Sequence, residues 1–259
     1  MKFTTIIVIH YTANANRSNF LRKTLTSLKT STKLPFELIV VDNGGSLDDS
    51  KYLVELTENG YINTYIRNHN NMSFGYARNQ GLRLANGDYL AICDNDIIFN
   101  PGWLETCIAI LDKYPDKKIY ATPIYNVAHW RPKYWSQEIL EIDGRIVRLN
   151  RRAGSNCWVM RRKDFEEVGD FWVHRVAGTK WTNEAGRKGY WAAVTPDIMV
   201  NDFGFRKGYS TNALIPIKIN LHNGDEIYLN QDEFKNKNSD FTYIKQRQFI
   251  PKEEHGEEI

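Results

Sequence analysis

The fold of this chain is most constrained by a regular alternation of short apolar runs with longer helix-like segments. The first apolar runs cover residues 3–9, 36–41 and 63–66, and the helix-like segments between them cover 19–29 and 49–58. This rhythm is typical of βαβ units, in which parallel strands are joined by crossover helices. We therefore expect an α/β protein with a mostly parallel central sheet flanked by helices.

The same pattern continues through the next fifty residues. A helix is predicted over 75–85, stopped by Asn86-Gly87, and a strand over 88–93 follows it. Pro101-Gly102-Trp103 is predicted to open a further helix that runs to residue 113. Beyond residue 119 the pattern becomes irregular, and six of the seven tryptophans lie between Trp130 and Trp191. We expect this irregular region to face an acceptor.

Length and composition favour one large domain. The chain has 259 residues, of which 42% are hydrophobic, enough for a sizeable buried core. We predict a single domain over 1–231, with two halves over 1–103 and 104–231. Residues 232–259 are polar and are predicted to form a solvated tail.

Charge, cysteines and hydropathy exclude several classes of protein. The net charge of +3 does not indicate a general nucleic-acid binder. Three cysteines with no close spacing fit neither a disulfide framework nor a zinc site, so we expect reduced core thiols. The first nine residues lack the long apolar stretch and small-residue cleavage site typical of a signal peptide, and no apolar run approaches the ~20 residues of a membrane span. These features predict a soluble cytoplasmic protein.

Asp94-Asn95-Asp96 stands at the end of the buried strand predicted over 88–93. Carboxyl ends of parallel strands are where α/β sheets present ligands. Hard divalent cations prefer carboxylate oxygens and keep open positions for phosphates, so this acidic turn is suited to a metal–diphosphate complex. The alternative is an Asx turn that ends the strand.

Two further strand ends carry polar clusters, His10-Tyr11-Thr12 and Asp42-Asn43-Gly44-Gly45. We expect them to line one crevice with the acidic turn. Asp42 offers acceptor oxygens to a pyrimidine imide, and Tyr11 offers an aromatic face to a ring. Ordinary loop polarity is the alternative. In the helix that begins at Gly75, Arg78 is placed to meet a diphosphate, unless it only forms a surface ion pair.

The first portion of the chain, through about residue 103, resembles the nucleotide-binding half of family 2 glycosyltransferases of the GT-A fold. Three segments carry the resemblance in order and spacing: 37–44, 75–81 and 94–96. It implies a Rossmann-like central sheet, with the nucleotide-binding half over 1–103 and an irregular acceptor-binding half over 104–231. It also implies that Asp42 and residues 10–12 (His10, Tyr11, Thr12) hold the base, that Arg78 contacts the nucleotide, and that Asp94, Asn95 and Asp96 serve the ribose, metal and diphosphate.

The second half resembles the family more weakly. Residues 154–169 are similar to the strand and helix that shape the donor-sugar and acceptor pocket, and Thr195-Pro196-Asp197 looks like the segment where the family carries Glu-Asp before a helix. Pro196 replaces that Glu, and a helix ending near residue 209 is expected after it. The resemblance implies that Asp197 is the catalytic base that takes the acceptor's proton. A helix-cap role for Asp197, and Asp202 as the base, are the alternatives.

Other candidates lie in the second half. His222 resembles the late histidine that completes the metal shell in many GT-A enzymes, although a lone His near a strand end is often structural. Trp158, Trp181 and Trp191 are candidates for stacking on the donor or acceptor sugar, since flat aromatic faces pack on pyranose rings. The arginines at 145, 148, 151 and 152 are interpreted as a solvated face.

Together these features predict a metal-dependent glycosyltransferase that moves a sugar from a nucleotide diphosphate sugar, UDP-sugar favoured, to an acceptor hydroxyl, with inversion. Asp96 and His222 would hold Mn2+ or Mg2+. A carbohydrate acceptor in polysaccharide biosynthesis is the default for the family, and nucleic acid is unexpected except as a modified acceptor. The alternatives are a sugar nucleotidyltransferase and a non-catalytic nucleotide-sugar binding protein. The oligomeric state is left open.

Overall fold

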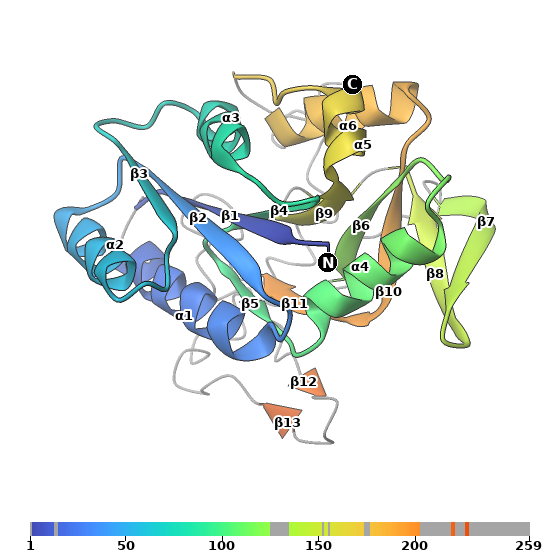
Figure 1. Ribbon diagram of the computed structural model, residues 1–259, viewed down its shortest axis with the longest axis horizontal. Helices are drawn as coiled ribbons and strands as arrows, with labels where there is room; N and C mark the ends of the chain where they lie inside the picture. Colours follow the sequence, from blue (N-terminus) through green and yellow to red (C-terminus); the bar gives the residue numbers. More distant parts are fainter. Residues whose placement is uncertain are drawn as a thin grey trace, which may run out of the picture.

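The computed structural model describes residues 2–12, 15–124, 135–151, 153–154, 156–173, 177–202, 219–220 and 226–227. A central sheet crosses the molecule, with helices packed on both of its sides (Figure 1). The nine strands of this sheet follow the order β3-β2-β1-β4-β9-β6-β10-β8-β7. The predicted α/β class with a central sheet flanked by helices is confirmed.

The first half of the sheet is parallel, as the alternation of apolar runs predicts. Strand β1 (Thr4–His10) lies between β2 (Phe36–Asn43) and β4 (Tyr89–Asp94), and β3 (Thr64–Asn68) pairs with the outer side of β2. All residues of β1 are buried, which explains why it reads as a continuous apolar run rather than as an alternating one.

Side chains of β1 alternate between two cores. Ile6 and Val8 belong to the core cluster that also contains residues of α1 (Ala15–Ser31), α2 (Leu47–Glu58) and α4 (Trp103–Lys113). Ile7 and Ile9 belong to the cluster with residues of α3 (Phe74–Leu84), α5 (Arg162–Val168) and α6 (Ala177–Arg187). In the described part of the chain, α1, α2 and α4 therefore cover one face of the sheet, and α3, α5 and α6 cover the other (Figure 1).

Beyond β4 the sheet becomes mixed, and the chain is more regular than its composition indicates. Strand β9 (Cys157–Arg161) is antiparallel to both β4 and β6 (Ile119–Ile124), whereas β10 (Trp191–Ile198) is parallel to β6. The hairpin of β7 (Trp135–Ile142) and β8 (Arg145–Asn150) adds the last two strands. One continuous sheet thus joins residues from both predicted halves, while the domain boundaries at 103 and 231 stay predictions.

The helix expected directly after Asp197 is not observed, which corrects that expectation. Residues Val200–Asp202 form strand β11, which pairs antiparallel with β5 (Ile97–Phe99), and Asp202 stands opposite Ile97. The ladder to β5 competes successfully with helix formation. The remainder of the expected helix from residue 203, His222 and the tail 232–259 lie outside the described residues. Two short strands, β12 (Ile219–Asn220) and β13 (Glu226–Ile227), pair with each other.

Two expectations from composition concern the whole chain. The three cysteines are free and buried, so the prediction of core thiols is confirmed. Within the described part of the chain, no helix combines the length and the apolar character that a membrane crossing requires.

Candidate active site

Three strand ends meet at one edge of the sheet. Strands β1, β2 and β4 are parallel and end at His10, Asn43 and Asp94. The three predicted polar clusters therefore follow neighbouring strands at the edge where parallel sheets bind ligands. Their predicted juxtaposition is confirmed.

His10 is fully buried at this edge and both of its ring nitrogens have partners. Its Nε2 lies 3.1 Å from Oδ2 of Asp49, and its Nδ1 lies 2.7 Å from Nδ2 of Asn95. Burial lowers the pKa of His10 from its ordinary value, against the opposing pull of the Asp42 and Asp49 carboxylates. The imidazole predicted to contact the base thus lies inside a protein network.

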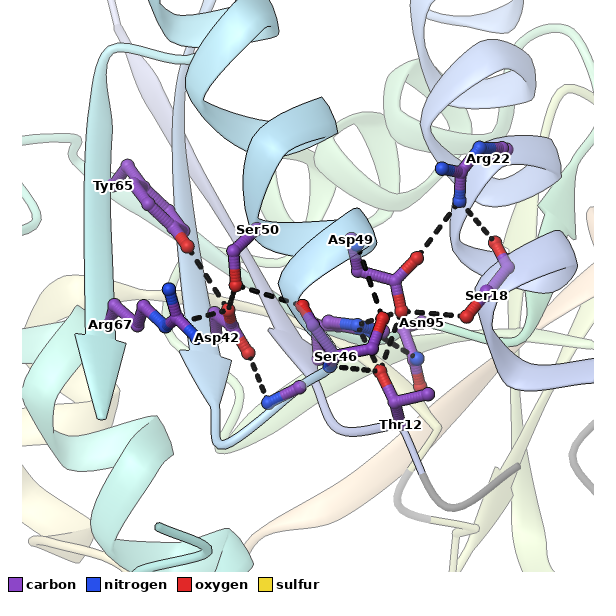
Figure 2. Close-up of polar contacts among 12 residues, drawn as sticks. Thr12, Ser18, Arg22, Asp42, Ser46, Asp49, Ser50, Tyr65, Arg67 and Asn95 are labelled. Atoms are coloured by element: carbon purple, nitrogen blue, oxygen red, sulfur yellow. Dashed lines mark hydrogen bonds and ion pairs between the residues drawn. The ribbon is translucent and has the colours of Figure 1, made fainter. Parts of the chain in front are cut away.

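Asp49, on the first turn of α2, is the centre of that network (Figure 2). Its carboxylate accepts hydrogen bonds from the Thr12 hydroxyl at 2.6 Å, from the Ser18 hydroxyl at 2.7 Å and from Nη1 of Arg22 at 2.9 Å. Burial alone would raise the pKa of Asp49, but these three donors outweigh it and hold the pKa well below its usual range. The carboxylate therefore ties the end of β1 to α1.

Sequence reasoning missed Asp49, although a signal was present. Ser46 caps α2 and accepts a hydrogen bond from the Asp49 amide at 3.2 Å, so Asp49 stands three residues after an N-cap. Such a residue usually turns its carboxylate back to the helix start. Here the carboxylate turns to His10 and Thr12 instead, which only the packing of α2 against β1 and α1 reveals.

Asp42 is also fully buried and engaged by protein donors. Its Oδ1 accepts the Gly45 amide at 2.6 Å, and its Oδ2 accepts hydroxyls of Ser50 at 2.7 Å and Tyr65 at 3.0 Å (Figure 2). Gly45 is needed for this close approach, because a Cβ there would lie 2.5 Å from Asp42 Oδ1. Asp42 thus anchors the turn after β2, while Tyr11 is 40% exposed beside it.

Arg78 is completely buried in an aromatic box beneath the acidic turn. Its Nη2 donates to Oδ1 of Asp94 at 3.0 Å, and its guanidinium lies 4.1 Å from the ring centre of Phe74 and 5.0 Å from that of Phe171. Burial lowers the pKa of Arg78 from its ordinary value, opposed by the Asp94 carboxylate. The contact of Arg78 with the acidic turn is thus direct, and its surface ion-pair alternative is excluded.

The other carboxylate of the turn, Asp96, forms an ion pair with Arg17 of α1. A guanidinium therefore serves as a stand-in for a cation beside Asp96, and Asp94 and Asp96 are the hard oxygen donors that Mn2+ and Mg2+ prefer. These residues fit a divalent metal. Among the described residues they do not meet a third carboxylate, His or Cys, and His222 lies outside that part of the chain.

Asp197 and Asp202 are placed differently. The Asp197 carboxylate, near the end of β10, forms an ion pair with Arg145 of the β7–β8 hairpin. The backbone of Asp202 pairs with Ile97, the residue that directly follows Asp96. The structure therefore sets the backbone of Asp202 opposite the residue that follows the acidic turn.

The three tryptophans chosen from sequence do not form an open platform. Trp158 and Trp181 are 0% and 3% exposed, and their rings stack on each other at 5.0 Å within the core. Trp191 begins β10, which runs in the same direction as β4, so it lies at the amino edge of the sheet, opposite the site. These positions correct the sugar-contact assignment: Trp158 and Trp181 are core residues, and Trp191 is on the wrong edge.

Trp172 is an exposed tryptophan next to α3, and sequence reasoning did not select it. Half of its surface is exposed, and Lys180 lies 4.4 Å from its ring centre. The preceding residue, Phe171, exchanges two 2.9 Å hydrogen bonds with the Asn79 side chain of α3, so Trp172 lies against the helix that carries Arg78. Its place just after the matched segment 154–169 was the available signal.

Comparison with known proteins agrees with this architecture. A family model described as glycosyl transferase family 2 matches residues 5–169. Hyaluronan synthase of Pasteurella multocida is 36% identical over 121 residues, which are 46% of this chain and 12% of that protein.

Two solved structures share the fold at low sequence identity. A mannosyltransferase of Pyrobaculum calidifontis, in complex with GDP-Man and Mn2+, is 18% identical with a TM-score of 0.62, covering 80% of this chain and 59% of that one. GalNAc-T7 with UDP, GalNAc and Mn2+ is 13% identical with a TM-score of 0.61, covering 78% of this chain and 44% of that one. The chain spans only part of each of these three proteins. Because the family match covers more than half of the sequence, this chain belongs to glycosyl transferase family 2, and it has the GT-A fold.

Proposed function

We propose that this chain transfers a sugar from a nucleotide diphosphate sugar to an acceptor hydroxyl, with a divalent cation held by Asp94 and Asp96. The observation that carries the proposal is the acidic turn at the carboxyl edge of the parallel strands, with one arginine beside each carboxylate. Both relatives of known structure named above were solved with a nucleotide and Mn2+. Mn2+ or Mg2+ is accordingly the proposed cofactor, and His222 the proposed third ligand.

The main electrostatic problem of the reaction is the charge on the departing diphosphate. A divalent cation, when bound, supplies a positive charge at that group. The protein's own contribution is to hold Asp94 in place through the buried Arg78, whose aromatic surroundings exclude water and strengthen the ion pair. Tyr11, exposed beside the turn that Asp42 anchors, is the proposed aromatic cover for the base, and a UDP-sugar the favoured donor.

Transfer with inversion requires a carboxylate that takes the acceptor's proton as the oxygen attacks. We place this base at Asp202 rather than Asp197, because the backbone of Asp202 pairs with Ile97, the residue that follows the acidic turn. Asp197 is already neutralised by Arg145. Trp172, exposed next to α3, is proposed as the acceptor contact in place of Trp158, Trp181 and Trp191. The proposed acceptor class is a cell-surface polysaccharide precursor, and the proposed location is the cytoplasm.

Two alternative functions predict different features of the chain. A sugar nucleotidyltransferase would place a glycine-rich phosphate loop after the first strand, and residues 10–14 contain no glycine. A non-catalytic nucleotide-sugar binding protein would keep the same site without turnover. Release of nucleoside diphosphate from the donor separates this last possibility from the transferase.

The first test is thermal stabilisation of the purified protein by UDP, GDP, CDP and TDP and their sugars, with Mn2+, Mg2+ or a chelator. A ligand that binds only the native state, at about 100 times its Kd, adds roughly 2.7 kcal/mol of stability. We expect one nucleotide to stabilise strongly, and only with metal. The Asp96→Asn variant should lose the effect, whereas Asp48→Asn should keep it, because the Asp48 side chain is 89% exposed on the surface of α2. Stabilisation that is unchanged by chelator would refute the metal role.

A further inference from the structure

The middle residue of the acidic turn points into the protein. Asn95 is 6% exposed, and its Nδ2 donates to Nδ1 of His10 at 2.7 Å. His10 in turn reaches Asp49 through Nε2. Asn95, His10 and Asp49 therefore form a hydrogen-bonded triad that runs from the acidic turn to the first turn of α2. Figure 2 labels its two ends, Asn95 and Asp49.

The hydrogen-bonding groups of the triad determine which ring nitrogen of the neutral His10 imidazole carries the proton. Nε2 lies 3.0 Å from the Thr12 hydroxyl and 3.1 Å from Asp49 Oδ2. The carboxylate only accepts hydrogen bonds, and the Thr12 hydroxyl gives its proton to Asp49, so the proton of the ring belongs on Nε2. Nδ1 is then an acceptor, which matches the amide N–H of Asn95. The pKa of His10 is lowered by burial, in agreement with a neutral ring. The orientation of the Asn95 amide is thus determined by a residue 85 positions away in the sequence.

The Asp49 end of the triad is held by several hydrogen bonds. Besides His10, Asp49 accepts hydrogen bonds from Thr12, Ser18 and Arg22, which come from the end of β1 and from α1. His10 itself is buried on β1 and packed next to Gly45, where a Cβ would lie 2.9 Å from its ring. A side chain enclosed in this way has no free face for a nucleotide base, but it is well placed to fix its neighbour.

We propose that His10 is a positioning residue for the acidic turn: oriented by Asp49, it holds Asn95 and so sets the geometry in which Asp94 and Asp96 meet the cation. This inference rests on the proposed function, and it replaces the base-contact role that the sequence suggested for His10. It assigns Asp49, which sequence reasoning missed, to the support of the same site.

The test uses three variants of the full chain and one control. His10→Phe keeps the ring volume and removes both nitrogens, Asn95→Leu removes the amide at similar volume, and the double variant combines them. Thr122→Val is the control. It removes a buried hydrogen bond from β6 to the Cys157 carbonyl, and this bond is not part of the triad. Mn2+ affinity in the presence of UDP is measured by electron paramagnetic resonance, and the affinities for UDP and GDP at saturating Mn2+ are measured by calorimetry.

We expect His10→Phe and Asn95→Leu each to weaken Mn2+ binding by at least tenfold, with the ratio of UDP to GDP affinity unchanged. Because both variants break the same link, the double variant should be no weaker than the worse single variant. Thr122→Val should bind Mn2+ as the wild type does, even if it melts at a lower temperature. A loss of folding in His10→Phe leaves the test to Asn95→Leu, which keeps the His10–Asp49 contact.

Three outcomes would overturn the inference. Wild-type Mn2+ affinity in both single variants would show that the link does not support the turn. A changed ratio of UDP to GDP affinity with normal Mn2+ binding would return His10 to a base contact. Losses that add in the double variant would mean that the two residues act separately. Failure of the proposed function is distinguishable, because the wild-type protein itself would then bind no nucleotide in a metal-dependent way.

Discussion

At the scale of single residues, burying the guanidinium of Arg78 costs free energy of desolvation. This guanidinium is fully buried, contacts Phe74, Phe171 and Trp158, and donates to Asp94. A buried ion pair is not a strong source of stability by itself, but removing one partner leaves the other charge poorly compensated. Arg78 therefore links the stability of the core to the charge of the acidic turn.

The Arg78→Met substitution should destabilise the protein by about 3 kcal/mol, since it breaks this pair while keeping an apolar side chain in the box. Chemical denaturation with urea measures the change. Arg83→Met on the same helix is the matched control, because the Arg83–Asp170 pair is 68% and 56% exposed and should contribute less than about 1 kcal/mol. Equal losses in the two variants would contradict the special role of the buried guanidinium.

The pH dependence of stability should carry the signature of His10. The pKa of His10 is lowered in the folded state, so the unfolded chain binds more protons as the pH falls below the unfolded value of about 6.5. The stability that His10 contributes is therefore complete above that pH and is lost below it. Urea midpoints at pH 7.5 and 5.5 should differ less in His10→Phe than in the wild type. An unchanged difference would assign the pH dependence to other groups.

At the scale of elements, helix α3 depends on close contact with the segment that carries Phe171 and Trp172. A Cβ on Gly75 would lie 1.9 Å from the Trp172 carbonyl oxygen, so the helix approaches this backbone only through glycine. Gly186 in α6 is also helical, but nothing lies within 4 Å of its added Cβ. Close packing therefore requires glycine at position 75 but not at position 186.

Substitution of these glycines by alanine should have opposite signs. Gly75→Ala is expected to destabilise the protein by about 1–3 kcal/mol, because backbone atoms must move. Gly186→Ala is expected to stabilise it by about 0.5–1 kcal/mol through helix propensity. Thermal and urea denaturation of both variants measure the effects. A stabilising Gly75→Ala would mean that the Trp172 segment moves away without cost.

At the scale of the whole molecule, the β11–β5 pairing brings together residues that lie far apart in the sequence. Strand β11 crosses from the end of β10 to pair with β5, so that Asp202 lies opposite the residue following Asp96. Asp197, five positions earlier, is instead tied to the β7–β8 hairpin by Arg145. The topology, more than the local sequence, distinguishes the two possible bases.

The two carboxylates should therefore differ in their effect on turnover. Asp202→Asn is expected to lower kcat by about 10²–10⁴, the usual contribution of a general base, while Asp197→Asn should lower it less than tenfold. Release of nucleoside diphosphate at saturating donor measures both. Retained nucleotide binding in Asp202→Asn, tested by thermal stabilisation, separates a lost base from a lost fold. The reverse order of effects would restore the base role to Asp197.

The sequence alone determined the local features of this protein. Apolar runs and caps predicted β1 to β4 and α1 to α4, although not the short strand β5, because those signals act over a few residues. The order of three polar clusters along the sequence predicted that they share one edge of the sheet. The resemblance to family 2 glycosyltransferases follows from the same short segments. In each case the information lies within one turn or one strand.

Long-range packing determined the rest. Asp49 and Asn95, which link His10 to α2 and to the acidic turn, lie 39 and 85 positions away from it in the sequence. No local pattern therefore distinguishes a histidine that supports the acidic turn from one that contacts a base. Likewise, only the tertiary contacts bury Trp158 and Trp181 and leave Trp172 exposed. Burial and hydrogen-bond pairing are properties of the assembled sheet and its helices, and a linear pattern records which groups need partners but not where in the chain those partners are.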